Sequence, residues 1–462
     1  MVRQLAWEVL RSGNPAPMRE VDVAADEVGL DARDRGLLRR IVGAEVRHRG
    51  TLRALVAQFA RGNPKVGLRT HLHVGMAQLF WCDRVPPRAA LSEVVDATRR
   101  TLGPSKTAYV NGVLRAVLRA RIPGHCGDPR RDLADSPWHF EEPIFADPAE
   151  HPYLWMEEAL SIPSMLAKRW GKRFGDERAF ALGRYFQTEP PLSLRVVQGE
   201  PGAVRDELLA HVAAFTGDAG EDEAPAVELR ASSHPAVWIA SGDIGHLLEA
   251  PAFHEGRVTV QGEAALRAAE LCAAAEGEEW LDLCAAPGGK TAVLAGAGAR
   301  VTAVDVSEAK LARLGATLDR LGLAERVTCV ESDGTAALGE RTFDGVLIDA
   351  PCSNTGVLGA RPGARWRFGK QTQRELTELQ YRLLVEGAAR VRPGGRLVWS
   401  TCSLEGDENG QLVRRFLEEH AGWEQDAQLE HLPGMPSQAE GEAPPPTDGG
   451  TATRLQRLEG LS

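Results

Sequence analysis

Apolar side chains recur at helical spacing through the first 122 residues. One set comprises Leu37, Leu38, Ile41 and Val42, and the next comprises Leu52, Leu55, Val56 and Phe59. Residues three or four positions apart share one face of a helix, so each set predicts an amphipathic helix. Prolines at 64, 86 and 87 interrupt the pattern. The stretch predicts an all-α bundle of about five to seven helices.

The pattern changes twice further along the chain. Residues 123–152 are rich in Pro, Gly and Asp, a composition typical of linkers. Helical spacing returns between 164 and 186, and short strand-like runs follow it. We therefore expect a helical domain over residues 1–135, a linker over 136–159, a small mixed α/β lobe over 160–250 and a last domain over 251–462.

From about residue 251, short apolar runs alternate with helical stretches. The strand candidates are 280–284, 300–306, 327–331, 345–349 and 396–400. Helical stretches between them lie at 290–297, 307–321 and 371–390. Such alternation predicts a parallel sheet covered on both faces, so the fold class is multidomain, an all-α bundle followed by an α/β Rossmann-like domain. Its ligand should lie at the carboxyl ends of the strands.

Composition limits the class of protein and the compartment that we expect. The chain has 462 residues, and no run approaches the roughly 18 apolar residues of a membrane span. Charges within MVRQLAWEVLRSG indicate an amphipathic helix and not a secretory signal. The seven cysteines form no CxxC pair. We expect reduced thiols in a cytoplasmic protein, with no metal site and no membrane contact.

Charge is distributed unevenly along the chain. Residues 1–130 hold 22 Lys and Arg against 12 Asp and Glu, a net charge of +10, whereas the whole chain carries −10, so the remainder carries −20. A basic front on an acidic body is expected where one module meets phosphates. A solvated basic helical surface with no nucleic-acid partner is the alternative.

A glycine-rich turn follows the first strand of the last domain, in WLDLCAAPGGKTAVLA. Gly288 and Gly289 allow a ligand to approach the backbone closely, and amides at the following helix start favour a carboxylate or phosphate. The end of this loop resembles a phosphate-binding P-loop. That motif needs a further glycine where Cys284 stands.

The next two strands each lead to an aspartate. Asp305, about 20 residues past the loop, is placed to bind ribose hydroxyls, and Asp333 is placed to reach an adenine amino group. Each aspartate taken alone is more often a helix cap or a turn residue, but strand-end features in consecutive units rarely arise by chance. NAD is the other ligand of such a fold, but the GxGxxG fingerprint is absent. The series therefore favours S-adenosylmethionine.

Two cysteines follow later strands, Cys352 in FDGVLIDAPCSNTG and Cys402 in RLVWSTCSLEGDEN. A thiolate that adds to carbon 6 of cytosine activates carbon 5 toward a methyl group, and a base then removes the carbon 5 proton. Two thiols beside one cofactor site fit this chemistry. The chemistry alone leaves open which thiol attacks. We expect Cys272 and Cys329 to be buried structural residues.

These motifs resemble the Sun (Fmu) family of RNA cytosine-5 methyltransferases. LDLCAAPGGKT is similar to its cofactor signature, and DAPCSNTGVL and STCSLEGDEN are similar to its two cysteine motifs. PAFHEGRVTVQGEAA and, upstream, AYVNGVLRAVLR resemble further family segments, the latter in a NusB-like RNA-binding domain. The resemblance covers nearly the whole chain.

The resemblance implies roles for individual residues. Cys402 would be the nucleophile, Cys352 would assist release of the product, and Lys290 would lie near the reacting pair. The cofactor site would be lined by Cys284, Ala285, Ala286, Pro287, Gly288, Gly289, Lys290, Asp305, Asp333 and Asp349. Alternatively, Asp349 faces the cytosine. Arg365, Trp366 and Arg367 suit either an RNA-contacting role or a plain surface cluster.

The implied substrate is 16S ribosomal RNA or its precursor, met by a monomeric protein. Methylation of transfer RNA is the alternative within enzymes, and a non-catalytic NusB-like RNA-binding factor is the alternative outside them. The chain departs from the family pattern at Gly262 and Gly363, where aspartates are expected, and at Gly450, where an aromatic pair is missing. These departures leave the RNA target less defined than the reaction.

Overall fold

The computed structural model describes residues 1–14, 16–216, 227–242, 244–434 and 447–459. It divides into two compact units. The first comprises Met1–Glu189 with Leu358–Gly369, and the second comprises Pro190–Val357 with Lys370–Ser462. None of the helices in the described part of the chain is long and apolar enough to cross a membrane.

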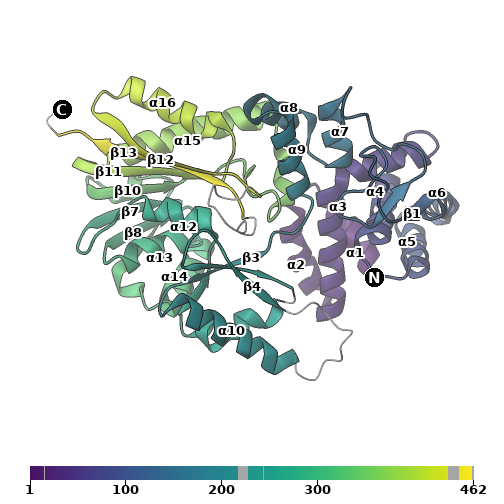
Figure 1. Ribbon diagram of the computed structural model, residues 1–462, viewed down its shortest axis with the longest axis horizontal. Coiled ribbons are helices and arrows are strands. Elements are labelled where there is room, and N and C mark those ends of the chain that lie inside the picture. Colours follow the sequence, from purple (N-terminus) through teal and green to yellow (C-terminus); the bar gives the residue numbers. More distant parts are fainter. Residues whose placement is uncertain (15, 217–226, 243, 435–446, 460–462) are drawn as a thin grey trace. The chain divides into compact units, whose positions relative to one another are not determined.

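The first unit is helical, as the periodicity predicted. Its helices are α1 (Val2–Arg11), α2 (Pro17–Val28), α3 (Ala32–Phe59), α4 (Val66–Trp81), α5 (Pro87–Leu102), α6 (Thr107–Ala120), α7 (Pro152–Ala159), α8 (Ser164–Phe174) and α9 (Asp176–Tyr185). Every residue of α4 from Thr70 to Trp81 is buried, because this helix packs against α1, α3, α5 and α6 (Figure 1).

The stretch expected to be a linker has structure of its own. Residues 136–159 contain β2 (Trp138–Phe140), which pairs with β1 (Arg121–Pro123), and α7. Trp155 and Met156 of α7 are buried. A polar, Pro-rich composition predicts a linker even where a few side chains are buried. The whole stretch belongs to the first unit.

A segment from the second half of the chain completes the first unit. Leu358–Gly369 includes the 3₁₀ turn Pro362–Arg367. Helix α3 is kinked at His48, and Trp366 Nε1 donates to the Val46 carbonyl just before this kink at 2.6 Å. The segment therefore binds backbone groups of α3.

Arg365 lies elsewhere than either sequence interpretation placed it. Its guanidinium is fully buried and donates to the backbone carbonyls of Arg47, Ser161, Phe186 and Leu358, at 3.2, 3.4, 2.9 and 3.3 Å. Burial, with a smaller effect of the Arg47 charge, lowers the pKa of Arg365 to about 9. This arginine is thus a structural cross-link within the first unit and neither an RNA contact nor a surface residue, whereas Arg367 is exposed.

The second unit contains a small antiparallel sheet. Its strand order is β4 (Glu228–Ala231), β5 (Val237–Ser241), β3 (Leu192–Val196) and β6 (Val258–Val260). Helix α10 (Pro201–Thr216) covers one face through Val204, Leu208 and Val212. The small lobe therefore starts later than expected and extends past residue 250, since α8 and α9 belong to the first unit.

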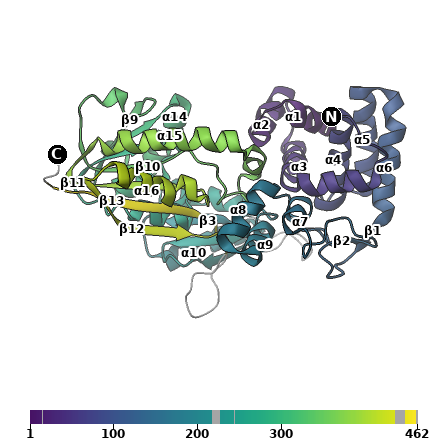
Figure 2. The ribbon, with the colours of Figure 1, turned by 90° about the horizontal axis from the view of Figure 1, so that it is seen from above.

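The main sheet of the second unit has seven strands. Their order is β12 (Trp423–His431), β13 (Gly450–Arg457), β11 (Val391–Thr401), β10 (Phe343–Asp349), β7 (Glu279–Leu283), β8 (Arg300–Asp305) and β9 (Val327–Glu331). All five predicted strands are present and pair in parallel. Strands β12 and β13, yellow in Figure 2, pair antiparallel at one edge and were not predicted.

Helices cover both faces of this sheet (Figure 1). On one face α15 (Lys370–Ala388) and α16 (Gly410–Glu419) pack through Leu383, Leu384 and Phe416. The other face carries α12 (Glu263–Glu270), α13 (Gly289–Gly296) and α14 (Glu308–Arg320). This is the Rossmann-like arrangement that the alternating pattern predicted, and it directs the carboxyl ends of the parallel strands to one edge.

Candidate active site at the carboxyl ends of the strands

The glycine-rich turn joins β7 to α13 with two left-handed residues. Cys284 has φ +62° and Gly288 has φ +99°. The Ala286–Pro287 peptide bond is cis. A Cβ at Gly288 would lie 2.8 Å from Leu314 Cγ, so both conformation and space require glycine there. The turn thereby brings the start of α13 to the carboxyl edge of the sheet.

Asp305, at the end of β8, is tied to this turn. Its Oδ2 accepts a bond from the Ala286 amide at 3.4 Å, and its Oδ1 lies 3.1 Å from Lys310 Nζ. The carboxylate is almost fully buried. Asp333, after the neighbouring strand β9, is largely exposed and lies 3.9 Å from the Arg382 guanidinium. Both aspartates therefore occupy the predicted strand-end positions.

This edge fits a cofactor that carries a carboxylate and a ribose. The first amides of α13 have no partner within the helix, so they can receive an anionic group. A carboxylate at this strand end, here that of Asp305, is the kind of group that accepts hydrogen bonds from ribose hydroxyls. Burial, reinforced by the charges of Asp349 and Asp305, raises the pKa of Cys284 to about 12, so this thiol remains protonated.

Lys290 and Asp349 form an ion pair between α13 and the end of β10. Lys290 Nζ lies 2.7 Å from Asp349 Oδ2, and Ser400 Oγ lies 3.4 Å from Asp349 Oδ1. Burial opposes the charge of Lys290, but the attraction and hydrogen bond of Asp349 outweigh it and the pKa of Lys290 is raised. The charge of Cys402 acts in the same direction, which puts Lys290 within electrostatic reach of that thiol.

The structure brings the two predicted thiols together. Cys352 Sγ and Cys402 Sγ are 3.1 Å apart, although 50 residues separate them in the chain. Cys402 Sγ also lies 3.4 Å from Asn354 Oδ1. The hydrogen bond with Cys402, followed by burial, raises the pKa of Cys352 well above its ordinary value. The surroundings of Cys352 therefore favour its protonated form.

The other cysteines lie apart from this pair. Cys272 is fully buried, as expected. Cys329 is exposed, contrary to expectation, because β9 is an edge strand whose side chains are mostly open to solvent.

Two buried carboxylates near the site escaped the sequence interpretation. Asp282, in the middle of β7, is fully buried and accepts a bond from Thr291 Oγ1 at 2.7 Å. Burial raises the pKa of Asp282 to about 7. Glu408, also fully buried, accepts bonds from the residues that follow both cysteines. The signal for Asp282 was a charged residue inside the apolar run WLDL, whereas no local pattern indicated the partners of Glu408.

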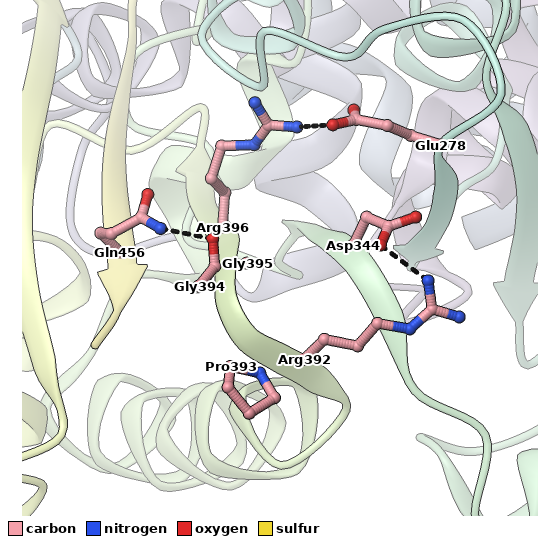
Figure 3. A pocket seen from close by; sticks show the side chains of 8 residues that line it. All are labelled: Glu278, Asp344, Arg392, Pro393, Gly394, Gly395, Arg396 and Gln456. Atoms are coloured by element: carbon pink, nitrogen blue, oxygen red, sulfur yellow. Dashed lines mark hydrogen bonds and ion pairs between the residues drawn. The ribbon is translucent and has the colours of Figure 1, made fainter. Parts of the chain in front are cut away.

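A hollow lies at the opposite, amino-terminal edge of the sheet (Figure 3). Arg392 there pairs with Asp344 at 2.6 Å and with Glu279 at 2.7 Å, and Arg396 pairs with Glu278. Each of these guanidinium groups is already paired with a carboxylate on, or next to, another strand of the sheet. The hollow is therefore lined by ion pairs that join the strands. The residues predicted to hold the cofactor lie at the other edge.

Comparison with known proteins agrees with this geometry. The family model described as 16S rRNA methyltransferase RsmB/F matches residues 269–444, and the NusB family model matches residues 2–119. The probable ribosomal RNA small subunit methyltransferase B of Bacillus subtilis is 30% identical over 412 residues, covering 87% of this chain and 84% of that protein. Ribosomal RNA small subunit methyltransferase B of Klebsiella pneumoniae is 32% identical over 418 residues, covering 88% and 85%.

Among solved structures, the one titled "Crystal Structure of PH0851" has a TM-score of 0.69 at 24% identity and covers 99% of both chains. This likeness supports the fold. The chain therefore belongs to the RsmB/F family of small-subunit ribosomal RNA methyltransferases, and it is an S-adenosylmethionine-dependent RNA methyltransferase with an N-terminal NusB domain.

Proposed function

We propose that this enzyme methylates carbon 5 of a cytidine in 16S ribosomal RNA through a covalent adduct with Cys402. The observation that carries the proposal is the 3.1 Å approach of Cys352 and Cys402 at the carboxyl edge of the sheet. The target nucleotide must leave its stack to reach such an edge, as base-modifying enzymes require. The names of the curated relatives support small-subunit ribosomal RNA as the target.

The cofactor would be held by the turn 284–290 with Asp305 and Asp333 around it, and Asp349 would face the cytosine instead. The α13 amides would take its carboxylate, and Asp305 would take its ribose. When bound, S-adenosylmethionine supplies an electrophilic methyl group on its sulfonium.

The thiols would divide the remaining chemistry. Cys402 Sγ adds to carbon 6 of the cytosine, and the ring electrons move to carbon 5, which takes the methyl group. Loss of the carbon 5 proton then drives elimination, which breaks the S–C6 bond and restores the ring. The hydrogen bond with Cys402 is the first cause of the raised pKa of Cys352. Conversion of Cys402 to a thioether removes that cause, so Cys352 can give up its own proton to solvent. The Cys352 thiolate then takes the carbon 5 proton, and Cys402 leaves carbon 6 as a thiolate.

The Lys290–Asp349 pair would orient the base. A carboxylate can accept hydrogen bonds from the exocyclic amine of cytosine. Asp349 presents its carboxylate between Lys290 and Ser400 and is about one-third exposed, which leaves it accessible to a nucleotide. Lys290, within electrostatic reach of Cys402, would stabilise the thiolate. We also propose that the protein acts as a cytoplasmic monomer.

The test uses purified protein, methyl-tritiated S-adenosylmethionine and separate pools of unmodified 16S RNA and transfer RNA, followed by nucleoside analysis. The expected result is label in 5-methylcytidine from 16S RNA only. Label from transfer RNA would keep the reaction and overturn the target. Label in another nucleoside, or cofactor binding without transfer to either RNA or to the ribosomal precursor particle, would overturn the proposed reaction.

A further inference from the structure

Glu408 is a fully buried carboxylate beside the two thiols. It belongs to the 3₁₀ turn Gly406–Glu408, just after the strand that leads to Cys402. No ion pair to Glu408 is found among the described residues. A buried carboxylate is costly unless hydrogen bonds compensate for its lost hydration. The hydrogen-bond donors around Glu408 therefore indicate which segments its carboxylate holds in place.

Two of these donors come from the first cysteine loop. The Ser353 amide donates to Glu408 Oε2 at 2.9 Å, and the Ser353 hydroxyl donates to Oε1. Ser353 follows Cys352 directly. A bond to both its backbone and its side chain fixes the direction in which the chain leaves Cys352.

A third donor comes from the second cysteine loop. The Ser403 hydroxyl donates to Glu408 Oε1 at 2.8 Å and lies 3.0 Å from the Ser353 hydroxyl. Ser403 follows Cys402 directly. The same carboxylate oxygen thus joins the residues next to both thiols, and this arrangement matches the short distance between the sulfur atoms.

The remaining donors come from helix α15. Gln373 Nε2 lies 2.9 Å from Glu408 Oε1, and Gln380 Nε2 lies 3.0 Å from Oε2. Gln380 Nε2 also reaches the Pro351 carbonyl at 2.8 Å, on the other side of Cys352. These amides anchor the carboxylate and the first cysteine loop to the same rigid helix.

We propose that Glu408 is the positioning residue that sets the two thiols for attack and release, an inference that rests on the proposed function of the Cys352–Cys402 pair. It acts through Ser353 and Ser403. Every group aimed at its oxygens is a donor, so the site requires a side chain with two acceptor oxygens. A glutamine would place an NH₂ group against one of these donors.

The test compares Glu408→Gln with Asp407→Asn in the full-length protein. Both changes remove one carboxylate from the same turn, and Asp407 is partly exposed. Because misplacement of a reacting group by about 1 Å costs about 100-fold in rate, E408Q is expected to lower kcat by about 10- to 100-fold. The KM for RNA and for S-adenosylmethionine should stay within about twofold, since Glu408 itself touches neither substrate. D407N should keep the kcat of the unchanged protein.

A second readout is independent of RNA. The charge of Glu408 contributes to the raised pKa of Cys352. The pH midpoint for alkylation of Cys352 by iodoacetamide, measured by peptide mass spectrometry, should therefore fall in E408Q and stay unchanged in D407N. A general loosening of the fold would instead expose Cys272 to alkylation, which is fully buried in the structure.

Three outcomes overturn the inference: an unchanged kcat in E408Q, an equal loss in D407N, or an unchanged alkylation midpoint. If E408Q does not fold, Ser353→Ala and Ser403→Ala decide, because each removes one hydroxyl from the same carboxylate. Each should lower kcat at constant KM, and unchanged kcat in both overturns the inference. Absence of methylation by the unaltered protein would instead refute the proposed function, while the alkylation midpoints would still report on Glu408.

Discussion

Cys352 and Cys402 differ in their surroundings, although each follows a strand in a similar context. Hydrogen bonding and burial favour the protonated form of Cys352. Cys402 lies within electrostatic reach of Lys290, whose positive charge stabilises a thiolate. At the scale of the residue, the environment therefore separates two side chains that the sequence leaves equivalent.

Substitution of each thiol tests this division. Cys402→Ala should abolish turnover, because no thiol remains to attack carbon 6. Cys352→Ala should accumulate a covalent protein–RNA adduct, seen as a shifted band on a denaturing gel. Cys329→Ala, which removes an exposed thiol on an edge strand, is the control and should behave as the unaltered protein. An adduct that accumulates in Cys402→Ala would reverse the roles.

Asp282 makes stability depend on pH. Its pKa is about 7 in the folded protein, because of burial, against about 3.9 in an unfolded chain. The folded state therefore holds this proton more tightly, and the resulting stabilisation is complete below about pH 4 and is lost as the pH rises through about 7. The slope for one such proton approaches about 1.4 kcal/mol per pH unit.

Asp282→Asn should remove this contribution, so its thermal midpoint should fall less between about pH 5 and 8 than that of the unaltered protein. Thermal unfolding across this range measures the difference. Asp319→Asn, at an exposed position on α14, should keep the original slope. Equal slopes for Asp282→Asn and the unaltered protein would contradict the prediction.

At the scale of the element, two glycines of helix α3 have different structural roles. At Gly36 a Cβ would meet nothing within 4 Å, whereas at Gly50 it would lie 1.9 Å from the Glu157 carbonyl oxygen of α7. Gly50 thus allows α3 and α7 to approach closely. Gly36 has no such packing role, and its only effect is to destabilise the helix relative to alanine.

Gly36→Ala should raise the free energy of unfolding of the first unit by up to about 1 kcal/mol, because alanine favours the helix. Gly50→Ala should lower it, since α7 must move. Hydrogen exchange of peptides from α3 and α7 measures both effects. A stabilised Gly50→Ala variant would contradict the close packing of these helices.

Arg365 holds a segment of the first unit through four backbone carbonyls. Arg365→Met keeps much of the buried volume but leaves these acceptors without a donor, each costing about 1–3 kcal/mol when it stays buried. Peptides covering Leu358–Gly369 and α9 should then exchange faster. Arg367→Met, a change of the same type at an exposed position two residues away, should leave exchange unchanged. Equal exchange in both variants would contradict the structural role.

At the scale of the whole molecule, charge and fold divide the chain in the same way. The basic excess lies within residues 1–130, and the NusB match spans residues 2–119 of the same helical unit. The acidic remainder includes the catalytic sheet. We therefore expect the first unit to supply most of the attraction to RNA phosphates.

Affinity for 16S RNA should fall linearly with salt on a logarithmic plot. Replacement of Arg115 and Arg119, exposed on α6, by glutamine should weaken binding and reduce the slope by about 1 for each phosphate that is no longer neutralised. Filter binding at several salt concentrations measures both. Replacement of Arg313 and Arg414, exposed in the second unit, should have a smaller effect. An equal loss of RNA affinity for both pairs of replacements would refute the idea that the first unit supplies most of the attraction to RNA.

The sequence by itself determined the five parallel strands of the main sheet, the helical front and which polar residues follow those strands. Parallel strands end at one edge of a sheet, so residues that follow successive strands, such as Asp305, Cys352 and Cys402, are expected to meet there. Strands β12 and β13 were missed: β12 is an edge strand whose mostly exposed polar side chains lack an apolar alternation, and β13 lies in a tail whose Pro- and Gly-rich start favoured a loop.

Only the tertiary structure decided the surroundings of these groups. The 3.1 Å approach of the two thiols, the donors around Glu408 and the carbonyls around Arg365 depend on segments far apart in the chain. The local pattern of apolar and polar residues predicts which face of a helix or strand is buried. It does not predict which distant backbone groups will need hydrogen-bond partners. Packing creates that need, because a buried polar group must find its partner inside the fold.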